Sequence, residues 1–475
     1  MGVHSTDGEQ AALAMKDQLQ AILRPHGQEH LLAFWDQLDD AERRSLAEQI
    51  EAIDFSLIRR LYQSRAEQDD VRQLAARAAP PPAFRLHAAE NPFTPQQAHG
   101  RAEEALGAGQ LGVILVAGGQ GTRLGFDHPK GMFPIGPLSG KTLFQIHVEK
   151  IVAAARRYGV RIPLYLMTSP ATHDETVAFF AAHGRFGLPA EDFFVFRQGT
   201  MPAVDAETGR ALLEAPGRIA ASPDGHGGTL AALDQSGALG DIERRGIRHL
   251  FYLQVDNPLV DICGREFVGY HLLADSEFST QVVAKRDPLD RVGNVVQIDG
   301  RLMVIEYSDL PDDAARRHNA DGSLAIWAGS IAVHVMDAAF LRRLVGSADA
   351  LPFHIAKKKV IAVDPLAKDV QPHSAIKFER FIDLMPQAER AIVVEVDQGR
   401  AFAPLKNAPG AKADTAQTVQ AQMAALAREW LRQAGAEVAG DVPVEISPLF
   451  ALDAGDLAGK VRPGTRVTKP TYFGE

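Results

Sequence analysis

The sequence holds a single cysteine, Cys263, among 475 residues, which excludes an intramolecular disulfide and a metal cluster built on cysteines. We expect Cys263 to be a small buried residue. No stretch approaches the roughly 20 apolar residues of a membrane span, and the first ten residues lack the apolar centre of a secretory signal. The sequence therefore predicts a cytoplasmic protein with no membrane partner.

Positive charge is in short supply as well. Lys and Arg number 50 against 60 acidic residues, which gives a formal net charge of −10. Binding to nucleic acid without sequence preference usually needs a basic face, so we expect no nucleic-acid partner. Two hydrolase signatures, the GxSxG elbow and the HExxH zinc motif, are also missing. A local basic pocket for a phosphorylated small molecule is compatible with these counts.

The first part of the chain follows a helical period. Between residues 8 and 80, apolar side chains such as Leu31 and Trp35 recur on one face, and charged or amide side chains fill the other positions. The stretch AAPPPAF (78–84) then breaks the pattern, because proline cannot continue a helix. We expect residues 1–100 to form a helical N-terminal region that packs on the next domain.

From Leu111 onwards, short apolar runs alternate with helical patterns such as residues 142–159. Four of the runs predict strands: 111–117, 163–169, 192–198 and 249–256. Such alternation is typical of a mainly parallel sheet with helices on both faces. Three closely spaced runs suggest an antiparallel addition to that sheet: 279–285, 294–298 and 302–307.

We therefore expect an α/β fold in three parts. A central, doubly wound, mainly parallel sheet would occupy residues 101–385 and carry the ligand site. The helical region 1–100 would flank it on one side. A small mixed α/β C-terminal domain, residues 386–475, would flank it on the other and contain a long helix at 415–435.

The stretch LVAGGQGTRLGFDHPKG (115–131) combines many glycines with basic residues at the predicted end of the first strand. Open α/β sheets bind ligands at that edge. Glycines there let backbone N–H groups approach phosphate oxygens closely. Arg123 and Lys130 add positive charge that could be directed at a triphosphate.

Three phosphate-binding motifs compete for this region. The dinucleotide motif GxGxxG begins well but meets Leu124 where its last glycine should stand. The P-loop pattern resembles GPLSGKT (136–142), but the loop is one residue short and no apolar strand precedes it. Thr142 is there better explained as the cap of the following helix. The third motif, GGxGTRL followed by PKG, fits throughout.

That third motif resembles the UTP-dependent sugar-1-phosphate uridylyltransferases. The UDP-N-acetylhexosamine pyrophosphorylases look closest, and the UDP-glucose and UDP-sugar pyrophosphorylases more distant. Further blocks look like family blocks in family order: KTLFQIHVEKI (141–151), FRQGTMPAV (196–204), SPDGHGG (222–228), QVDNPLV (254–260), VIEYSDL (304–310), IKFERFIDLMP (376–386) and APLKNAPG (403–410). The resemblance implies a nucleotide-diphospho-sugar transferase-like fold. It also implies an enzyme that makes a UDP-sugar and pyrophosphate from UTP and a sugar 1-phosphate.

The resemblance also implies roles for individual residues in nucleotide binding. The backbone of four residues would hold the uridine: Val116, Ala117, Gly118 and Gly119. Gln198 and Gly225 would read the edge of the uracil. Arg123, Lys130 and Lys406 would act on the phosphates in catalysis, and Lys377 would contribute to nucleotide binding. Asp256 would bind Mg²⁺, a hard cation that prefers oxygen ligands.

The identity of the sugar is where the sequence departs from the closest relatives. Glu306 and Tyr307 would touch the sugar hydroxyls, but His226, Trp327 and Ser330 stand where the N-acetylhexosamine enzymes tend to have asparagines. We place N-acetylglucosamine 1-phosphate slightly first, with glucose 1-phosphate or a broad range of sugars as the alternative. A nucleotide-sugar binding protein without turnover is a second alternative, and a dehydrogenase is a third. The sequence assigns no oligomeric state.

Overall fold

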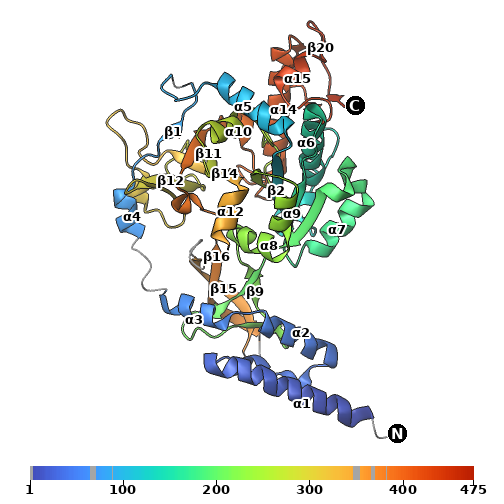
Figure 1. Ribbon diagram of the computed structural model, residues 1–475, viewed down its shortest axis with the longest axis vertical. Helices are drawn as coiled ribbons and strands as arrows, with labels where there is room; N and C mark the ends of the chain where they lie inside the picture. The colour runs from blue at the N-terminus through green and yellow to red at the C-terminus, as the bar shows by residue number, and fades with distance from the viewer. Residues whose placement is uncertain are drawn as a thin grey trace. The chain divides into compact units, whose positions relative to one another are not determined.

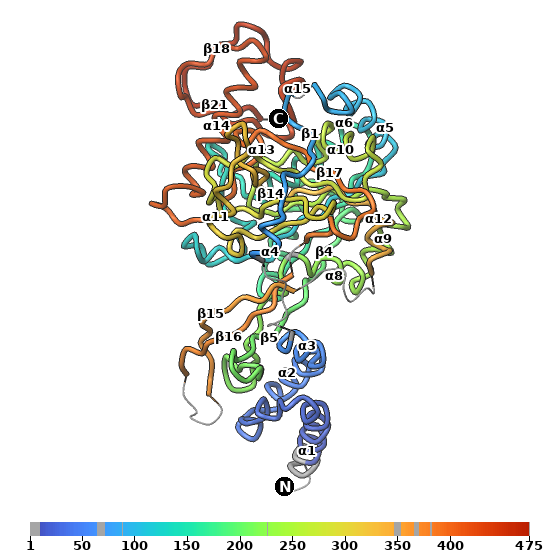
Figure 2. The backbone as a smooth tube through the Cα atoms, turned by 90° about the vertical axis from the view of Figure 1, so that its left-hand side faces the viewer, coloured from blue at the N-terminus to red at the C-terminus, as the bar shows by residue number. Residues whose placement is uncertain are grey.

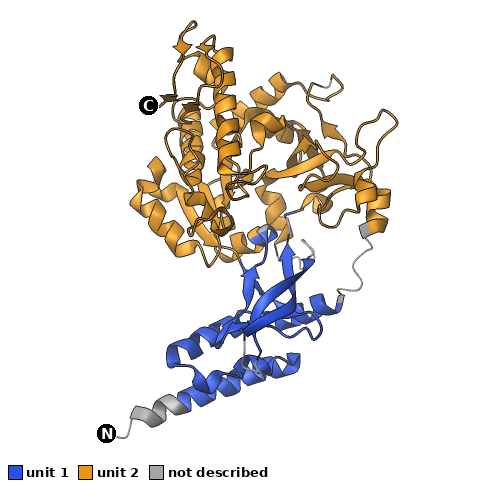
Figure 3. Cartoon of the chain, turned by 180° about the vertical axis from the view of Figure 1, so that it is seen from behind, with its two compact units in different colours: residues 1–69, 199–228, 351–382 blue, residues 70–198, 229–350, 383–475 orange. Residues whose placement is uncertain are grey.

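The computed structural model describes residues 4–64, 71–87, 89–345, 353–364, 370–380 and 382–474. The chain divides into two compact units, coloured separately in Figure 3. Unit 1 comprises residues 1–69, 199–228 and 351–382, and unit 2 comprises residues 70–198, 229–350 and 383–475. Each unit is therefore assembled from three separate stretches of the chain.

Three helices begin unit 1: α1 (His4–Leu23), α2 (Asp40–Glu51) and α3 (Phe55–Ser64). Helix α2 starts at a capping box, in which the Asp39 side chain accepts from the backbone of Glu42 and the Glu42 side chain accepts from the backbone of Asp39. The helical N-terminal region expected from the sequence is confirmed over these residues.

The remainder of unit 1 is a five-stranded sheet in the order β6 (Val204–Asp205), β16 (Val370–Arg380), β15 (Phe353–Val363), β7 (Leu213–Ala215) and β8 (Arg218–Ile219). Strands β15 and β16 pair along their whole length as an antiparallel hairpin. A separate pair joins β5 (Thr200–Pro202) to β9 (Ala221–Pro223). Leu19, Trp35 and Leu46 from the helical region pack with Leu213 and Val363 in one buried cluster.

The large sheet of unit 2 runs in the order β1 (Ala83–Phe84), β17 (Ala391–Glu395), β11 (Phe278–Ala284), β14 (Ala328–Asp337), β10 (His249–Gln254), β2 (Leu111–Val116), β3 (Leu164–Thr168) and β4 (Phe193–Arg197). Neighbours on this path pair in parallel, except that β14 is antiparallel to β10 and β11. Of the three runs expected as an antiparallel addition, two form it: β12 (Gly293–Ile298) and β13 (Arg301–Ile305), which extend from β14. The third, 279–285, instead forms β11 of the large sheet, parallel to β17. The expected mainly parallel sheet is confirmed.

Helices cover both faces of this sheet (Figure 1). Val113 and Leu115 of β2 belong to a cluster that includes residues of α5 (Pro95–Gly107), α6 (Leu143–Tyr158) and α10 (Arg265–Leu273). Side chains alternate between faces along a strand, so Ile114 and its cross-strand neighbour Tyr165 point the other way. The Tyr165 hydroxyl donates to Asp241 of α9 (Ala238–Arg244), which places α9 on that second face. The sheet is doubly wound, as the sequence predicts.

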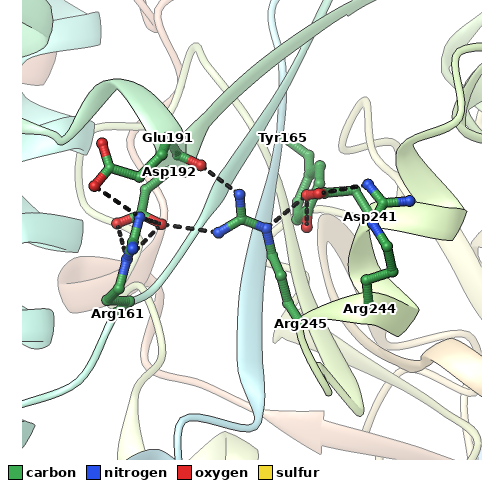
Figure 4. Close-up of polar contacts among 7 residues, drawn as sticks. All are labelled: Arg161, Tyr165, Glu191, Asp192, Asp241, Arg244 and Arg245. Atoms are coloured by element: carbon green, nitrogen blue, oxygen red, sulfur yellow. Dashed lines mark hydrogen bonds and ion pairs between the residues drawn. The ribbon is translucent and has the colours of Figure 1, made fainter.

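An ion-pair network fixes α9 against the edge of the sheet (Figure 4). Arg245, which follows α9, contacts Asp241 with its Nε at 2.7 Å and Asp192, ahead of β4, with its Nη1 at 3.0 Å. Arg161 binds the same Asp192 carboxylate through two nitrogens. Asp192 is buried, and a buried carboxylate needs such partners to offset the loss of water.

Two strands far apart in the sequence meet in the large sheet, and local sequence patterns do not indicate this pairing. β1 lies within the range 1–100 and β17 within 386–475, yet they pair with each other, as Figure 2 also shows. The three ranges expected as domains therefore do not coincide with the two compact units. The last part of unit 2 has an additional core between α14 (Ala416–Gln433) and the short strands and helix that follow it.

No helix among the described residues is both long enough and apolar enough to cross a bilayer.

The crossing of α5 and α10 yields a first prediction. A Cβ atom at Gly269 of α10 would lie 2.0 Å from the carbonyl oxygen of Ala98 in α5. Because a backbone atom cannot move aside cheaply, we expect Gly269→Ala to destabilise unit 2 by about 3 kcal/mol. Gly100→Ala in α5 is the matched control, since nothing lies within 4 Å of that site. It should stabilise slightly, by up to about 1 kcal/mol. Calorimetric melting that shifts equally in both variants would contradict the close packing.

Candidate active site

The parallel strands of unit 2 end at one edge of the sheet. Val116 at the end of β2 pairs with Gln254 at the end of β10, and Met167 of β3 pairs with Phe196 of β4. The segments that follow these strands therefore start side by side. Most of the site residues expected from the sequence lie on these segments, and open α/β sheets bind ligands at this edge.

The glycine-rich loop after β2 closes on itself through backbone hydrogen bonds. The N–H of Lys130 donates to the carbonyl of Gly119 at 3.0 Å, and the N–H of Gly121 donates to the carbonyl of His128 at 2.9 Å. A Cβ at Gly119 would meet no atom within 4 Å, so the space beside its backbone is open. Arg123 lies in the loop as an exposed residue. The loop thus offers bare backbone next to a basic side chain.

Gly118 and Gln198 are brought into direct contact. A Cβ at Gly118 would lie 2.3 Å from Oε1 of Gln198, so only glycine leaves room for this amide. Gln198 is buried, and its N–H donates to the Thr168 carbonyl at the end of β3. Val116 and Ala117, which precede Gly118, are buried as well. The amide that the family resemblance assigns to the uracil therefore lies against the backbone that it assigns to the uridine.

Lys130 and Asp256 also come together. Their Nζ and Oδ2 atoms are 3.7 Å apart, and both side chains are largely but not completely buried, at 20% and 13% exposure. The N–H of Leu405 donates to the Asp256 carbonyl at 2.8 Å, so Lys406 follows directly on a residue bound to Asp256. Three of the charged residues expected at the site thus gather from segments far apart in the sequence.

Asp414 is a neighbour of this group that the sequence reasoning missed. Its carbonyl accepts from the N–H groups of Lys406 and Asn407, both at 2.9 Å. Burial raises the pKa of its carboxyl; Lys406 opposes the shift, whereas Asp256 and Asp290 add to it. No motif marks Asp414, which lies four residues after the APLKNAPG block. It adds a carboxylate beside Asp256 and Lys406.

Glu306 and Ser330 both lie close to Gly293. A Cβ there would be 3.4 Å from Oε1 of Glu306 and 3.8 Å from Cβ of Ser330. The partly buried Asp383, a second residue that sequence reasoning missed, accepts from the N–H of Val304 at 2.7 Å. Burial raises the pKa of Asp383 to about 7, against backbone hydrogen bonds, and Glu306 adds to the shift. The expected sugar-contacting carboxylate thus has a second carboxyl group next to it.

Trp327 and Tyr307 differ in their surroundings. Trp327 stands immediately before β14 and is buried, with the guanidinium carbon of Arg85 3.8 Å from the centre of its ring. Arg85 in turn binds Glu395 at the end of β17 at 2.6 Å. Tyr307 is 49% exposed. Of these two expected sugar contacts, Tyr307 is open to solvent and Trp327 is covered by Arg85.

Three expected residues belong to unit 1: Gly225, His226 and Lys377. Gly225 has a φ of +85°, and a Cβ there would lie 2.3 Å from the carbonyl oxygen of Arg380, so this position favours glycine on both counts. Lys377 is partly buried on β16, opposite Ala356 of β15. The side chain of His226 lies outside the described part of the structure.

The P-loop-like stretch at 136–142 has a structural explanation. The Glu445 carboxylate accepts from the backbone N–H groups of Leu138 and Ser139, both at 2.7 Å. These donors are therefore occupied by the chain's own anion. The Thr142 side chain accepts from the N–H of Gln145 and caps α6, as expected from the sequence. Cys263 is buried, also as expected.

His147 forms a hydrogen bond with the residue that precedes Asp256. Its Nε2 donates to the Val255 carbonyl at 3.0 Å, and its Nδ1 has no hydrogen-bond partner among the described residues. Burial, aided by the charge of Lys150, lowers the pKa of His147 to about 3. The folded protein therefore holds this imidazole neutral with its proton on Nε2.

Comparisons with known proteins identify relatives over most of the chain. The profile of the family described as UTP–glucose-1-phosphate uridylyltransferase matches residues 55–436. A UDP-N-acetylglucosamine pyrophosphorylase of Saccharomyces cerevisiae is 38% identical over 75% of this chain and 78% of its own. A UDP-N-acetylhexosamine pyrophosphorylase-like protein 1 of Xenopus tropicalis is 36% identical over 86% of this chain and 83% of its own. The crystal structure of the uridine diphosphate N-acetylglucosamine pyrophosphorylase from Trypanosoma brucei superimposes with a TM-score of 0.83 at 25% identity. It covers 96% of this chain and 98% of its own.

The neutral His147 yields a prediction on pH. The unfolded chain takes up a proton at this residue near pH 6.5, but the folded chain does so only near pH 3. Below about pH 6.5, His147 therefore takes up a proton when the chain unfolds. Its contribution lowers the free energy of unfolding by up to about 1.4 kcal/mol for each pH unit of acidification. His147→Gln keeps a donor for Val255 but does not titrate. Between pH 6.5 and 4, the melting temperature of this variant should fall less steeply than that of the wild type. Equal slopes in the two proteins would contradict the neutral state of His147.

Proposed function

We propose that this chain, which belongs to the UTP–glucose-1-phosphate uridylyltransferase family, transfers the uridylyl group of UTP to a sugar 1-phosphate. A phosphate oxygen of the sugar 1-phosphate attacks the α-phosphorus of UTP. The new oxygen–phosphorus bond replaces the bond to the β-phosphate, and pyrophosphate leaves. The products are a UDP-sugar and pyrophosphate.

The observation that carries this proposal is the convergence of Lys130 and Asp256 next to the glycine-rich loop. A cation and a carboxylate 3.7 Å apart, from segments that follow two neighbouring parallel strands, form a charged edge of the sheet. The open space over Gly119 lies on the same loop. A triphosphate needs positive charge and room to approach the backbone, and Lys130 and the open space at Gly119 support its proposed place here. Asp256 is the proposed oxygen ligand for a metal ion.

For the nucleotide, the proposal assigns the uracil to Gln198 and Gly225 and the uridine to the backbone of residues 116–119. The contact between Gly118 and Gln198 supports this assignment, because it directs a buried amide towards bare backbone. A buried amide that pairs with one base discriminates strongly against bases that leave it unpaired. The enzyme should therefore prefer UTP to purine nucleotides.

Mg²⁺ is the proposed cofactor. The chemistry of the donor set fits, because Asp256 supplies carboxylate oxygens at this edge and Mg²⁺ binds oxygen ligands. Burial and the charge of Asp256 raise the pKa of the Asp414 carboxyl, which makes Asp414 a second candidate ligand. Bound there, Mg²⁺ would neutralise charge on the phosphates of UTP. A cytoplasmic location belongs to the same proposal, since UTP is an intracellular nucleotide.

The chemistry requires no general base, because the attacking phosphate oxygen is already ionised at neutral pH. The chain's residues would act by position and charge. Lys130 and Arg123 would hold the phosphates of UTP beside the glycine-rich loop, and Lys406 would add charge from the segment bound to Asp256. The family resemblance assigns Lys377 to the nucleotide phosphates as well.

The sugar is proposed to be N-acetylglucosamine, to which two of the relatives' names refer. Glu306 and Tyr307 would bind its hydroxyls, with Asp383 behind Glu306. His226, Trp327 and Ser330 favour the glucose alternative, because they replace amide side chains that could bond an acetamido group. In this chain, the Arg85 guanidinium covers the Trp327 ring.

One experiment tests both the reaction and the sugar. Pyrophosphate release is measured with UTP, ATP or GTP and with N-acetylglucosamine 1-phosphate or glucose 1-phosphate, then with both sugars in competition. We expect turnover with UTP and a kcat/KM that favours N-acetylglucosamine 1-phosphate.

Absence of pyrophosphate release with every pair would leave a binding protein without turnover and overturn the proposed reaction. A tenfold preference for glucose 1-phosphate, equal to about 1.4 kcal/mol in transition-state binding, would reverse the order of the sugars alone. Equal use of ATP would remove Gln198 from the base site.

Substitution at the charged edge tests the mechanism. Lys130→Ala should lower kcat about a hundredfold, because one lost charge on the transition state typically costs about 3 kcal/mol. Asp256→Asn should raise the Mg²⁺ concentration needed for half-maximal rate. The exposed Lys469→Ala is the matched control and should behave as the wild type. If Lys130→Ala retained the wild-type kcat at saturating UTP with an unchanged melting temperature, Lys130 would not act on the phosphates.

A further inference from the structure

A second group of ligand-type side chains lies at the opposite end of β10 from Asp256. His249 is the first residue of β10, and its cross-strand partner Asp337 is the last residue of β14. His271 joins them from the last turn of α10. At roughly 3.3 Å per strand residue, this group is about 20 Å from the proposed phosphate site. The proposed uridylyl transfer gives these three side chains no role.

The three side chains converge on one another. Nδ1 of His249 and Nε2 of His271 lie 2.6 Å and 3.0 Å from the same oxygen, Oδ1 of Asp337. One ligand atom from each residue lies within 4.8 Å of the others. Among the described residues, no other group of three or more histidines, cysteines or carboxylates meets that condition. The two imidazole rings are set edge to face, 5.3 Å apart.

A hydrogen bond on the far side of His271 fixes which of its nitrogens faces Asp337. Its Nδ1 lies 2.8 Å from Oγ of Ser279, and that hydroxyl donates to Oγ of Ser276. The Ser279 oxygen is then an acceptor for Nδ1–H, which leaves the lone pair of Nε2 directed at the Asp337 carboxylate. A cation, either a proton on Nε2 or a metal ion, then lies between this nitrogen and the anionic oxygen 3.0 Å from it. A metal-bound histidine typically has its other nitrogen held in this way.

The alternative explanation, a capping role for Asp337, is not supported. Asp337 occupies the N-cap position of α12 (Ala338–Leu344), but its side chain makes no capping hydrogen bond there. One oxygen of its carboxylate, Oδ1, is instead within hydrogen-bond distance of both histidines. The side chain is 30% exposed, whereas His271 is 1% exposed. Solvent, and with it a metal ion, can therefore reach the group from the Asp337 side.

Two imidazole nitrogens and one carboxylate oxygen are a donor set that suits Zn²⁺ better than Mg²⁺. Bonds of about 2.0–2.1 Å in a tetrahedral site separate the ligand atoms by about 3.3 Å. The observed separations from Oδ1 are 2.6 Å and 3.0 Å, so each nitrogen and the half-buried Asp337 carboxylate would move apart by less than about 1 Å to accommodate the ion. The two histidine nitrogens lie within 4.8 Å of one another. A water molecule would take the fourth position.

We propose that His249, His271 and Asp337 form a Zn²⁺ site that is separate from the nucleotide site and clamps α10 to the ends of β10 and β14. The ion would join three elements at the amino end of β10. Its role would be structural, because the group lies far from the glycine-rich loop.

Binding is tested with the untagged full-length chain, titrated with Zn²⁺ by calorimetry in a buffer with excess Mg²⁺. The Mg²⁺ keeps Zn²⁺ away from the carboxylates of the nucleotide site. We expect one saturable Zn²⁺ per chain, a higher melting temperature with Zn²⁺, and the visible absorption of tetrahedral Co²⁺ when cobalt replaces zinc.

The Zn²⁺ affinities of substituted chains distinguish the proposed site from Zn²⁺ binding to surface residues. Asp337→Asn and His249→Ala should each weaken Zn²⁺ binding more than tenfold, whereas the exposed His318→Ala should not. Ser279→Ala leaves all three ligands in place and should weaken binding about 10- to 100-fold, as the loss of a hydrogen bond to a metal-bound histidine does. This last variant covers the case in which a ligand substitution unfolds the chain.

Failure of the wild-type chain to bind Zn²⁺ saturably would overturn the proposal, as would equal affinity in Asp337→Asn. Neither result depends on UTP or a sugar phosphate, so the outcome is independent of the proposed function.

Discussion

The parallel pairing of β2 with β10 is the constraint on which the rest of the candidate active site depends. Because Val116 is paired with Gln254, the glycine-rich loop and the segment with Asp256 leave the sheet at the same level. Lys130 can then return along the loop, through its bond to Gly119, and bring its ammonium group to Asp256. The same pairing puts His249 at the other end of β10, with the whole length of the strand between the two charged groups.

A later part of the chain, which follows β17, contributes further residues to the edge where β2 and β10 end. β17 enters the large sheet between β1 and β11, and this return brings the following segment to the site. Leu405 bonds to Asp256, and the Lys406 backbone bonds to Asp414. The charged edge of the sheet is therefore built from segments far apart in the chain. Lys406 depends for its position on the pairing of a strand some 140 residues after β10 begins.

Two loops in this protein look suited to bind anions, and their surroundings separate them. Both contain glycine and backbone N–H groups near the start of α6 or the end of β2. The stretch 136–142 is filled by Glu445, which returns from the C-terminal part of the chain. The stretch 115–131 keeps open space at Gly119 and exposes Arg123. A glycine-rich pattern therefore predicts a possible anion site, and the distant chain decides whether a ligand can use it.

The sequence by itself determined the elements and the motif residues of the site. The predicted strands 111–117, 163–169, 192–198 and 249–256 and the helix 142–159 agree with β2, β3, β4, β10 and α6 to within one or two residues. Apolar periodicity, proline breaks and capping threonines are local properties that can be read along the chain. The approach of Lys130 to Asp256 follows from the order of the motifs on parallel strands, although their roles stay predictions.

Only the tertiary structure decided which segments meet. The pairing of β1 with β17, the assembly of unit 1 from three stretches, and the positions of Asp414 and Asp383 depend on contacts between residues far apart in sequence. Such contacts leave little trace in local composition, because any suitable strand or carboxylate could satisfy them. The Arg85 side chain over Trp327, and the meeting of His249, His271 and Asp337, have the same origin. Packing of the whole chain, rather than any one segment, selects these partners.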